Sequence, residues 1–227
     1  MLLLALDTAT PQAGVAIGGP DGLRAVFHLV NNGRHGEMLV PAIEFVCRVS
    51  RVELKSLTAV AVDVGPGLFT GLRVGVATAK AIAFAHGIPT VAVSSLEILA
   101  ASARLSARTI VPVIDALSDE VYWASFLAER GVVRQLTPPA LSSPADLVSA
   151  VGQIGGEVLL VGDGAIRYAE LFAGMSRVEV AGGGVQFPSA ASLVELATAK
   201  AQREEYVSAA DLQIQYLRRP YVHSKKE

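Results

Sequence analysis

The chain opens with short apolar runs that predict strands, at residues 2–6, 14–17 and 23–30. The first run ends at Asp7 and Thr8, and turn-forming residues separate it from the second and the second from the third. This order predicts an antiparallel meander. A helical pattern then covers residues 36–50, in which Leu39 and Ile43 recur at four-residue spacing and share one face.

A second strand pattern, at residues 60–64, runs into the glycine-rich segment 65–67 and then into a long helical pattern that extends to His86. Thr70 suits the N-cap of this helix, because its hydroxyl can accept a hydrogen bond from a backbone N–H in the first turn. Gly87 then ends the helix. A strand followed by a glycine loop and a helix is how many α/β proteins present backbone amides to an anion.

The second half of the chain repeats the order of the first. A strand at residues 109–114 ends at Asp115, and a returning strand follows at 120–126. Further on, the pattern predicts strands at 157–161 and 178–180 and helices at 165–173 and 189–203. The repetition lies in the pattern rather than in residue identity, and it predicts an internal duplication.

These elements predict an α/β protein of two duplicated, mixed-sheet lobes flanked by helices. We expect an N-terminal lobe at residues 1–103 that carries a partner interface, a C-terminal lobe at 104–205 and a solvated tail at 206–227. Two lobes that each open with a strand ending in aspartate are similar to the actin-like ATPase (ribonuclease H-like) architecture of actin, hexokinase and Hsp70. In those proteins the two aspartate-bearing hairpins face each other across a cleft.

The composition of the chain argues against several classes of protein. Hydrophobic residues make up 52% of the chain and the mean hydropathy is +0.46, yet no apolar run approaches the ~18 residues that span a bilayer. The single cysteine, Cys47, excludes internal disulfides, and the apolar start shows no signal-peptide pattern, so we expect a cytoplasmic protein. A net charge of −2 argues against a protein that binds nucleic acid on its own, although basic residues gather at Arg218, Arg219, Lys225 and Lys226.

The candidate phosphate loop does not match a known nucleotide motif. Gly65 and Gly71 enclose five residues and Leu72 follows, whereas the P-loop needs four residues and then Lys-Ser/Thr. An anion-binding turn and a purely structural turn both remain open. We therefore predict a vestigial nucleotide cleft, formed by Asp7, Thr8, Gly65, Gly67, Asp115, Gly162 and Gly164.

The sequence gives little support for a metal site or for a catalytic nucleophile. The histidines have no partner histidine three or four residues away; Leu39 stands four residues after His35, for which we expect an exposed side chain. No Gly-x-Ser-x-Gly motif is present, and Cys47 has no identifiable base. We expect no catalytic residue, no metal and no cofactor.

The long helix has one side almost without side chains, because Gly71, Gly75 and Ala79 recur every fourth residue. Glycine inside a helix costs about 1 kcal/mol relative to alanine, so a close neighbour must offset the loss. Small residues at this spacing allow two helices to pack closely. We predict a partner-binding surface made of Gly71, Leu72, Gly75, Thr78, Ala79 and Ile82, with Leu39 and Ile43 of the preceding helix.

Several segments, in the right order along the chain, carry a family resemblance: LALDTAT, RHGEMLVP, GPGLFTGLRVGVATAKAIA, VSSLEILA, VIDALSDEVYWA and a late YLR. Together they resemble the bacterial TsaB (YeaZ) family, and GPG-x-x-TGLR-x-G is the most specific of them. The resemblance implies an actin-like fold and a role in making threonylcarbamoyladenosine beside the tRNA anticodon.

The resemblance also implies partners. A catalytic paralogue, TsaD, transfers the threonylcarbamoyl group, TsaB pairs with it as a non-catalytic subunit, and the ATPase TsaE is a third member. Self-pairing through the same surface is implied as well, and tRNA is contacted only through the complex.

Two positions depart from relatives. The catalytic paralogue has an H-x-x-x-H metal pair where this chain has His35 and Leu39, and the family usually has arginine where this chain has Leu117. The alternative functions are an ATP-dependent phosphotransferase or ATPase that uses Asp7 and Asp115, and a metallopeptidase-like protein.

Overall fold

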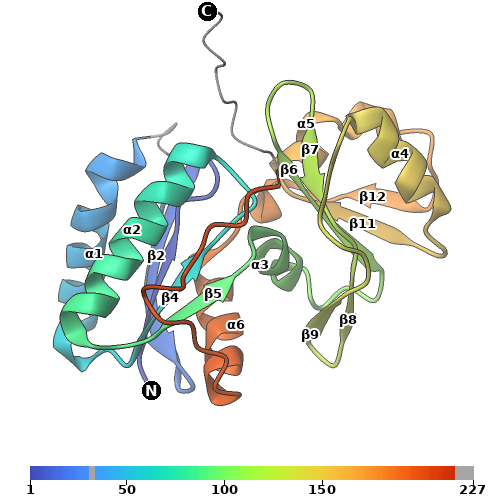
Figure 1. Cartoon of the computed structure of the whole chain (residues 1–227). Helices are drawn as coiled ribbons and strands as arrows, with labels where there is room; N and C mark the ends of the chain where they lie inside the picture. The colour runs from blue at the N-terminus through green and yellow to red at the C-terminus, as the bar shows by residue number, and fades with distance from the viewer. Residues whose placement is uncertain (31–33, 218–227) are drawn as a thin grey trace, which may run out of the picture.

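The computed structural model describes residues 1–30 and 34–217, and it confirms an α/β fold with two mixed sheets (Figure 1). The first sheet has the strand order β3-β2-β1-β4-β5. Its strands are β1 (Leu3–Asp7), β2 (Gln12–Gly19), β3 (Gly22–Val30), β4 (Ala59–Asp63) and β5 (Thr90–Val93). The first three strands form the predicted antiparallel meander, and β4 and β5 join it in parallel.

Helices cover both faces of this sheet. The even-numbered residues of β1, Leu4 and Leu6, pack against α1 (His35–Ser50) and α2 (Phe69–His86). The odd-numbered Leu3 and Ala5 pack against α6 (Ala190–Gln202). Successive side chains of a strand point to opposite faces of the sheet. A strand that helices cover on both faces is therefore a continuous apolar run in the sequence, as is the case here.

The second sheet repeats this plan. The order β10-β7-β6-β11-β12 places β6 antiparallel to β7 and parallel to β11, and β8 pairs with β6 and β9. Its strands are β6 (Thr109–Asp115), β7 (Val121–Trp123), β8 (Phe126–Glu129), β9 (Val132–Gln135), β10 (Ala140–Ser142), β11 (Val158–Val161) and β12 (Val178–Val180). The shared topology agrees with the predicted duplication.

The remaining helices connect or cover these sheets. They are α3 (Ser95–Ser102), α4 (Pro144–Gln153), α5 (Asp163–Arg167) and the 3-10 helices η1 (Leu54–Ser56), η2 (Ala169–Phe172) and η3 (Gly183–Val185). The helix α3 bridges the lobes, because Leu96 and Leu99 belong to the second core whereas Ile98 packs with α6 on the first sheet. No helix in the described part of the chain combines the length and apolarity needed to cross a bilayer.

The end of the chain returns to the first lobe, which corrects the expected limits. The helix α6, expected in a second lobe at 104–205, packs on the first sheet. Residues 206–217, expected in a solvated tail, form what we call the strap, which is drawn in red across the front of the first lobe in Figure 1. Leu212 of the strap is buried in the first core. The basic residues 218, 219, 225 and 226 lie outside the described residues.

Candidate functional site

Two buried carboxyl groups lie side by side at the ends of β1 and β4. The parallel register pairs Leu6 with Val62 and so places Asp7 next to Asp63. The Oδ1 atom of Asp7 accepts a hydrogen bond from the Ala9 N–H at 3.0 Å, which shapes the turn after β1. Asp63 lies in the segment that the sequence pattern assigned to an apolar strand, so it was missed as a site residue.

Burial raises the pKa of both carboxyl groups in this pair. Burial and the charge of Asp63 raise the pKa of Asp7 well above its ordinary value. Burial raises the pKa of Asp63 to about 6, although hydrogen bonds donated by the Ser95 hydroxyl at 2.6 Å and the Gly65 N–H at 2.8 Å oppose the shift. Both pKa values rise because two adjacent buried carboxylates cannot both ionise cheaply.

The start of α2 covers the turn that follows Asp7. The Leu68 N–H donates to the Ala9 carbonyl at 2.7 Å, and the Thr8 hydroxyl donates to the Gly71 carbonyl at 2.7 Å. Both Asp7 and Thr8 are buried. The turn that would face a phosphate in a nucleotide cleft is thus in contact with protein.

The glycines of this segment permit that contact. A Cβ added at Gly67 would lie 2.2 Å from the Ala9 carbonyl oxygen, and one at Gly71 would lie 2.0 Å from the Thr8 carbonyl oxygen. At Gly75 the nearest atom would be the Thr8 hydroxyl oxygen at 2.4 Å. These distances are shorter than any real Cβ contact, so the glycines serve internal packing.

This geometry corrects the predicted partner surface. Gly71, Gly75 and Ala79 face the turn and the sheet, and Leu72, Leu39 and Ile43 are also buried. Only Thr78 and Ile82 of the predicted set are half-buried. A second protein therefore cannot lie along this stripe while the lobe is folded.

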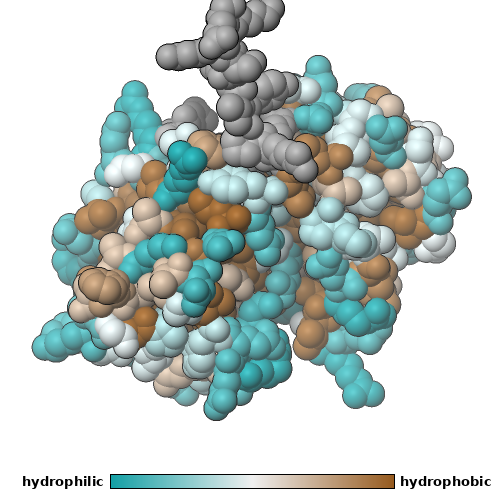
Figure 2. Space-filling model, in the orientation of Figure 1, coloured by the Kyte–Doolittle hydropathy of each residue, from teal (hydrophilic) through white to brown (hydrophobic). Residues whose placement is uncertain are grey.

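The opposite side of α2 carries a second line of small residues at the same spacing. Ala77, Ala81 and Ala85 are exposed, and Phe84 next to them is 86% exposed. Figure 2 shows apolar surface over the part of the first lobe where α2 runs. We call Ala77, Ala81, Phe84 and Ala85 the outer face of α2. The four-residue spacing of its alanines is visible in the sequence.

The expected N-cap and the expected exposed histidine are also corrected. The helix α2 begins at Phe69 after Leu68, so Thr70 lies inside the first turn rather than at the cap. His35 is 2% exposed at the start of α1, and burial lowers its pKa. Within the described residues, no three His, Cys, Asp or Glu side chains gather as a metal site would require.

The second lobe holds a more open carboxyl pair, at the ends of β6 and β11. The Asp163 Oδ1 atom accepts from the Asp115 N–H at 3.1 Å and from the Gly164 N–H at 2.9 Å, and burial raises the pKa of Asp163 to about 6. The Asp115 carboxylate forms an ion pair of 2.7 Å with Arg167, whose side chain is 50% exposed. A Cβ at Gly162 would lie 2.1 Å from the Val113 carbonyl oxygen, so this glycine also serves packing.

The predicted cleft residues thus form two separate groups. Asp7 and Thr8 lie at the buried turn after β1, and Gly65 and Gly67 lie in the segment after Asp63 that packs on it. Asp115, Gly162 and Gly164 lie in the second lobe with Asp163 and Arg167.

Known proteins resemble the chain over most of its length. The family model described as "TsaD: tRNA N6-adenosine threonylcarbamoyltransferase" matches residues 30–217. The tRNA threonylcarbamoyladenosine biosynthesis protein TsaB of Bacillus subtilis (strain 168) is 32% identical over 162 residues, which is 71% of each chain. TsaB of Escherichia coli (strain K12) is 29% identical over 221 residues, covering 96% of this chain and 95% of the relative.

Solved structures also resemble this chain. YeaZ from Pseudomonas aeruginosa superposes with a TM-score of 0.85 at 30% identity, covering 95% of this chain and 99% of that one. Ethanolamine utilization protein EutJ from Carboxydothermus hydrogenoformans, at 12% identity and a TM-score of 0.54 over 87% of this chain and 90% of that one, shares the fold alone and supports the predicted actin-like architecture. The chain belongs to the TsaB (YeaZ) family of tRNA threonylcarbamoyladenosine biosynthesis proteins.

Proposed function

We propose that this chain is a non-catalytic partner of a TsaD-type threonylcarbamoyl transferase and is required for forming threonylcarbamoyladenosine next to the anticodon of tRNAs. The observation that carries the proposal is the outer face of α2, an exposed line of alanines with an almost fully exposed phenylalanine beside it. The partner would place a helix of its own against this line.

The physical basis is close helix packing. Alanines at four-residue spacing leave a shallow groove, which lets a second helix approach to the 8–10 Å typical of packed helices. Burying an exposed Phe84 side chain would contribute about 2–3 kcal/mol. Val40 of the neighbouring α1 is also 54% exposed. Large exposed apolar side chains grouped on one face are typical of protein interfaces.

The state of the two carboxyl pairs supports a role without catalysis. In the first lobe, protein contacts fill the place beside Asp7 where a substrate phosphate would need to lie. In the second lobe, Asp115 is engaged with Arg167. The geometry therefore favours the partner function over an ATPase that uses Asp7 and Asp115.

The proposal extends to a wider assembly that the family resemblance implies. The proposal includes a TsaE-type ATPase as a third member and contact with tRNA through the complex, which suits a net charge of −2. In the absence of the catalytic paralogue, two copies of this chain would pair through the same outer face.

The test introduces charge at the centre of the outer face. Ala81→Arg is expected to abolish co-elution with the purified catalytic paralogue in size-exclusion chromatography. Ser149→Arg, on the exposed side of α4 in the second lobe, is the matched control and should pair normally. Normal pairing by Ala81→Arg, with an unchanged melting temperature, would contradict the proposal.

A further inference from the structure

The strap brings one aromatic residue from the end of the chain to the start of α2. Val207 and Thr90 exchange backbone hydrogen bonds of 2.9 Å in both directions, and the Gln215 N–H donates to the Val64 carbonyl at 2.8 Å. Between these anchors, Leu212 is 1% exposed. The strap is therefore fixed to the first lobe along its length, and Tyr216 follows directly after the second anchor.

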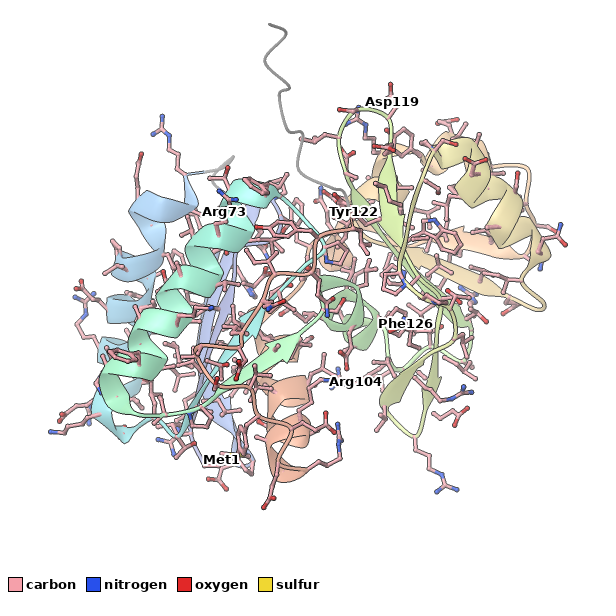
Figure 3. All side chains as sticks on the ribbon, viewed as in Figure 1. Met1, Arg73, Arg104, Asp119, Tyr122 and Phe126 are labelled. Atoms are coloured by element: carbon pink, nitrogen blue, oxygen red, sulfur yellow. The ribbon has the colours of Figure 1, made fainter. Side chains whose placement is uncertain are left out.

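Tyr216 completes a three-residue cluster with Phe69 and Arg73, which we call the aromatic–arginine cluster. The two rings have centroids 5.5 Å apart, and the Arg73 guanidinium carbon lies 3.8 Å from the centroid of the Phe69 ring. The Arg73 Nε–H also donates to the Tyr216 hydroxyl at 3.4 Å. Figure 3 labels Arg73 at the upper end of α2.

The cluster remains open to solvent although it is ordered. Phe69 and Tyr216 are each 42% exposed, and Arg73 is exposed as well. Stacking on Phe69 and the bond to Tyr216 restrict the arginine before any ligand arrives, which reduces the side-chain entropy lost on binding. In the described part of the chain, the two terminal nitrogens of Arg73 carry no hydrogen bond, so they can donate in parallel to both oxygens of a carboxylate.

The position of the cluster connects it to the outer face of α2. Arg73 precedes Ala77 by four residues and Ala81 by eight, so all three lie on the same side of the helix. Tyrosine and arginine are the residue types over-represented among those that dominate interface energies. A nucleic acid would instead require several cations for its phosphates, whereas the cluster supplies a single arginine.

We propose that the aromatic–arginine cluster anchors the catalytic partner by binding an aspartate or glutamate side chain of that protein. The inference rests on the proposed function, since it takes the same partner and the same side of α2. Arg73 donates two hydrogen bonds to the partner carboxylate, while Phe69 and Tyr216 exclude water from the ion pair. The strap is then part of the interface rather than a free tail.

The experiment measures affinity for the purified catalytic paralogue by calorimetry, with the full chain and matched variants. Arg73→Lys keeps the positive charge but loses the planar guanidinium group that stacks on Phe69. It is expected to weaken binding about 30-fold, which corresponds to ~2 kcal/mol. Tyr216→Phe loses only the hydroxyl that orients Arg73 and should weaken binding about 3-fold. The controls are Arg134→Lys in the second lobe and Tyr206→Phe in the strap, where Tyr206 has a similar exposure of 41%.

The outcomes separate the two proposals. Wild-type affinity in Arg73→Lys together with lost pairing in Ala81→Arg would overturn the anchor and leave the proposed function standing. A wild-type chain that does not bind the paralogue would overturn both. If the chain binds tRNA alone and Arg73→Lys abolishes that binding, the ligand is a phosphate backbone and the carboxylate assignment is wrong. Unchanged melting temperatures in all four variants confirm that affinity, not folding, was altered.

Discussion

Each lobe has a pair of aspartates at equivalent positions. The pair in the first lobe is buried, whereas the pair in the second lobe is partly exposed. In the first lobe Asp7 and Asp63 are both buried, and burial raises the pKa of each. In the second, Asp163 is mostly enclosed, but Asp115 reaches the surface and meets an exposed arginine. The same duplicated strand topology thus gives one sealed pair and one open pair.

The difference arises from the turn after the first strand of each lobe. In the first lobe α2 packs directly on the turn. Gly67, Gly71 and Gly75 have no side chains that would prevent this contact. In the second lobe the turn projects outward, and Leu117, Ser118 and Asp119 all adopt left-handed backbone angles, with φ of 61°, 53° and 55°. Figure 3 labels Asp119 at the upper edge of this lobe.

The comparison supports the proposed role of the outer face of α2. A cleft that needs both pairs cannot act when one pair is sealed inside its own lobe. The same glycines that seal it fix the orientation of α2, and this orientation turns Ala77 and Ala81 outward. Burial of the turn and exposure of the proposed partner surface are therefore two results of one packing arrangement.

The largest effect is expected from forcing α2 off the turn. Gly71→Val would place its Cβ against the Thr8 carbonyl, and we expect it to lower the free energy of unfolding by roughly 3 kcal/mol or more, measured by urea denaturation. Gly36→Ala is the control, because among the described residues its Cβ would have only Val74 nearby, at 4.0 Å, and alanine is the better helix former. A Gly71→Val protein as stable as the wild type would show that the seal does not exist.

The next largest effect concerns pH. Both carboxyls of the first pair bind protons more tightly in the folded chain than in the unfolded chain, where aspartate titrates near ~3.9. Their stabilising contribution is therefore complete below about pH 4 and is lost as pH rises through the folded pKa values. With a pKa of about 6, Asp63 alone accounts for a loss of roughly 3 kcal/mol between these limits.

Two amide substitutions compare the pairs in this respect. Asp7→Asn keeps a donor toward Asp63 and removes the titrating proton, so the melting temperature should fall less between pH 4.5 and about pH 8 than in the wild type. Asp163→Asn should flatten the curve to a smaller extent, since Asp163 has no fully buried carboxyl beside it. Equal flattening by both variants would contradict the difference between the lobes.

The smallest effect is expected from the open pair. Arg167→Gln removes the ion pair with Asp115, and because Arg167 is 50% exposed the cost should stay below about 1 kcal/mol. The measurement is the same urea denaturation, at low and high salt, with the salt dependence reduced in the variant. A loss of more than about 2 kcal/mol would mean that the second pair is as structural as the first.

The sequence predicted most of the fold because the strands are buried on both faces and end in clear turn signals. The meander, the strand–glycine–helix unit and the repeated strand–aspartate order were all readable. Asp63 could also have been found, since VAVD repeats the LALD pattern of β1. It was passed over because one charged residue inside an apolar run does not interrupt a strand pattern.

The candidate site was less predictable. The helix α2 carries small residues at four-residue spacing on two opposite sides, and periodicity alone cannot say which side meets the sheet. The close contact of Thr8 with Gly71 and Gly75 decides this, and it depends on residues more than sixty positions apart. The strap was missed because its residues follow no strand or helix period; the bridge to Thr90, the burial of Leu212 and the bond from Gln215 to Val64 hold it in place.

The central claim is that this chain acts through the outside of α2 and not through the aspartates of its first lobe. The direct test is threonylcarbamoyladenosine formation on tRNA by the purified catalytic paralogue, with wild-type chain, Asp7→Asn or Ala81→Arg supplied as the partner. Activity close to wild type with Asp7→Asn and lost with Ala81→Arg is the predicted result. Activity lost with Asp7→Asn and retained with Ala81→Arg would contradict the claim.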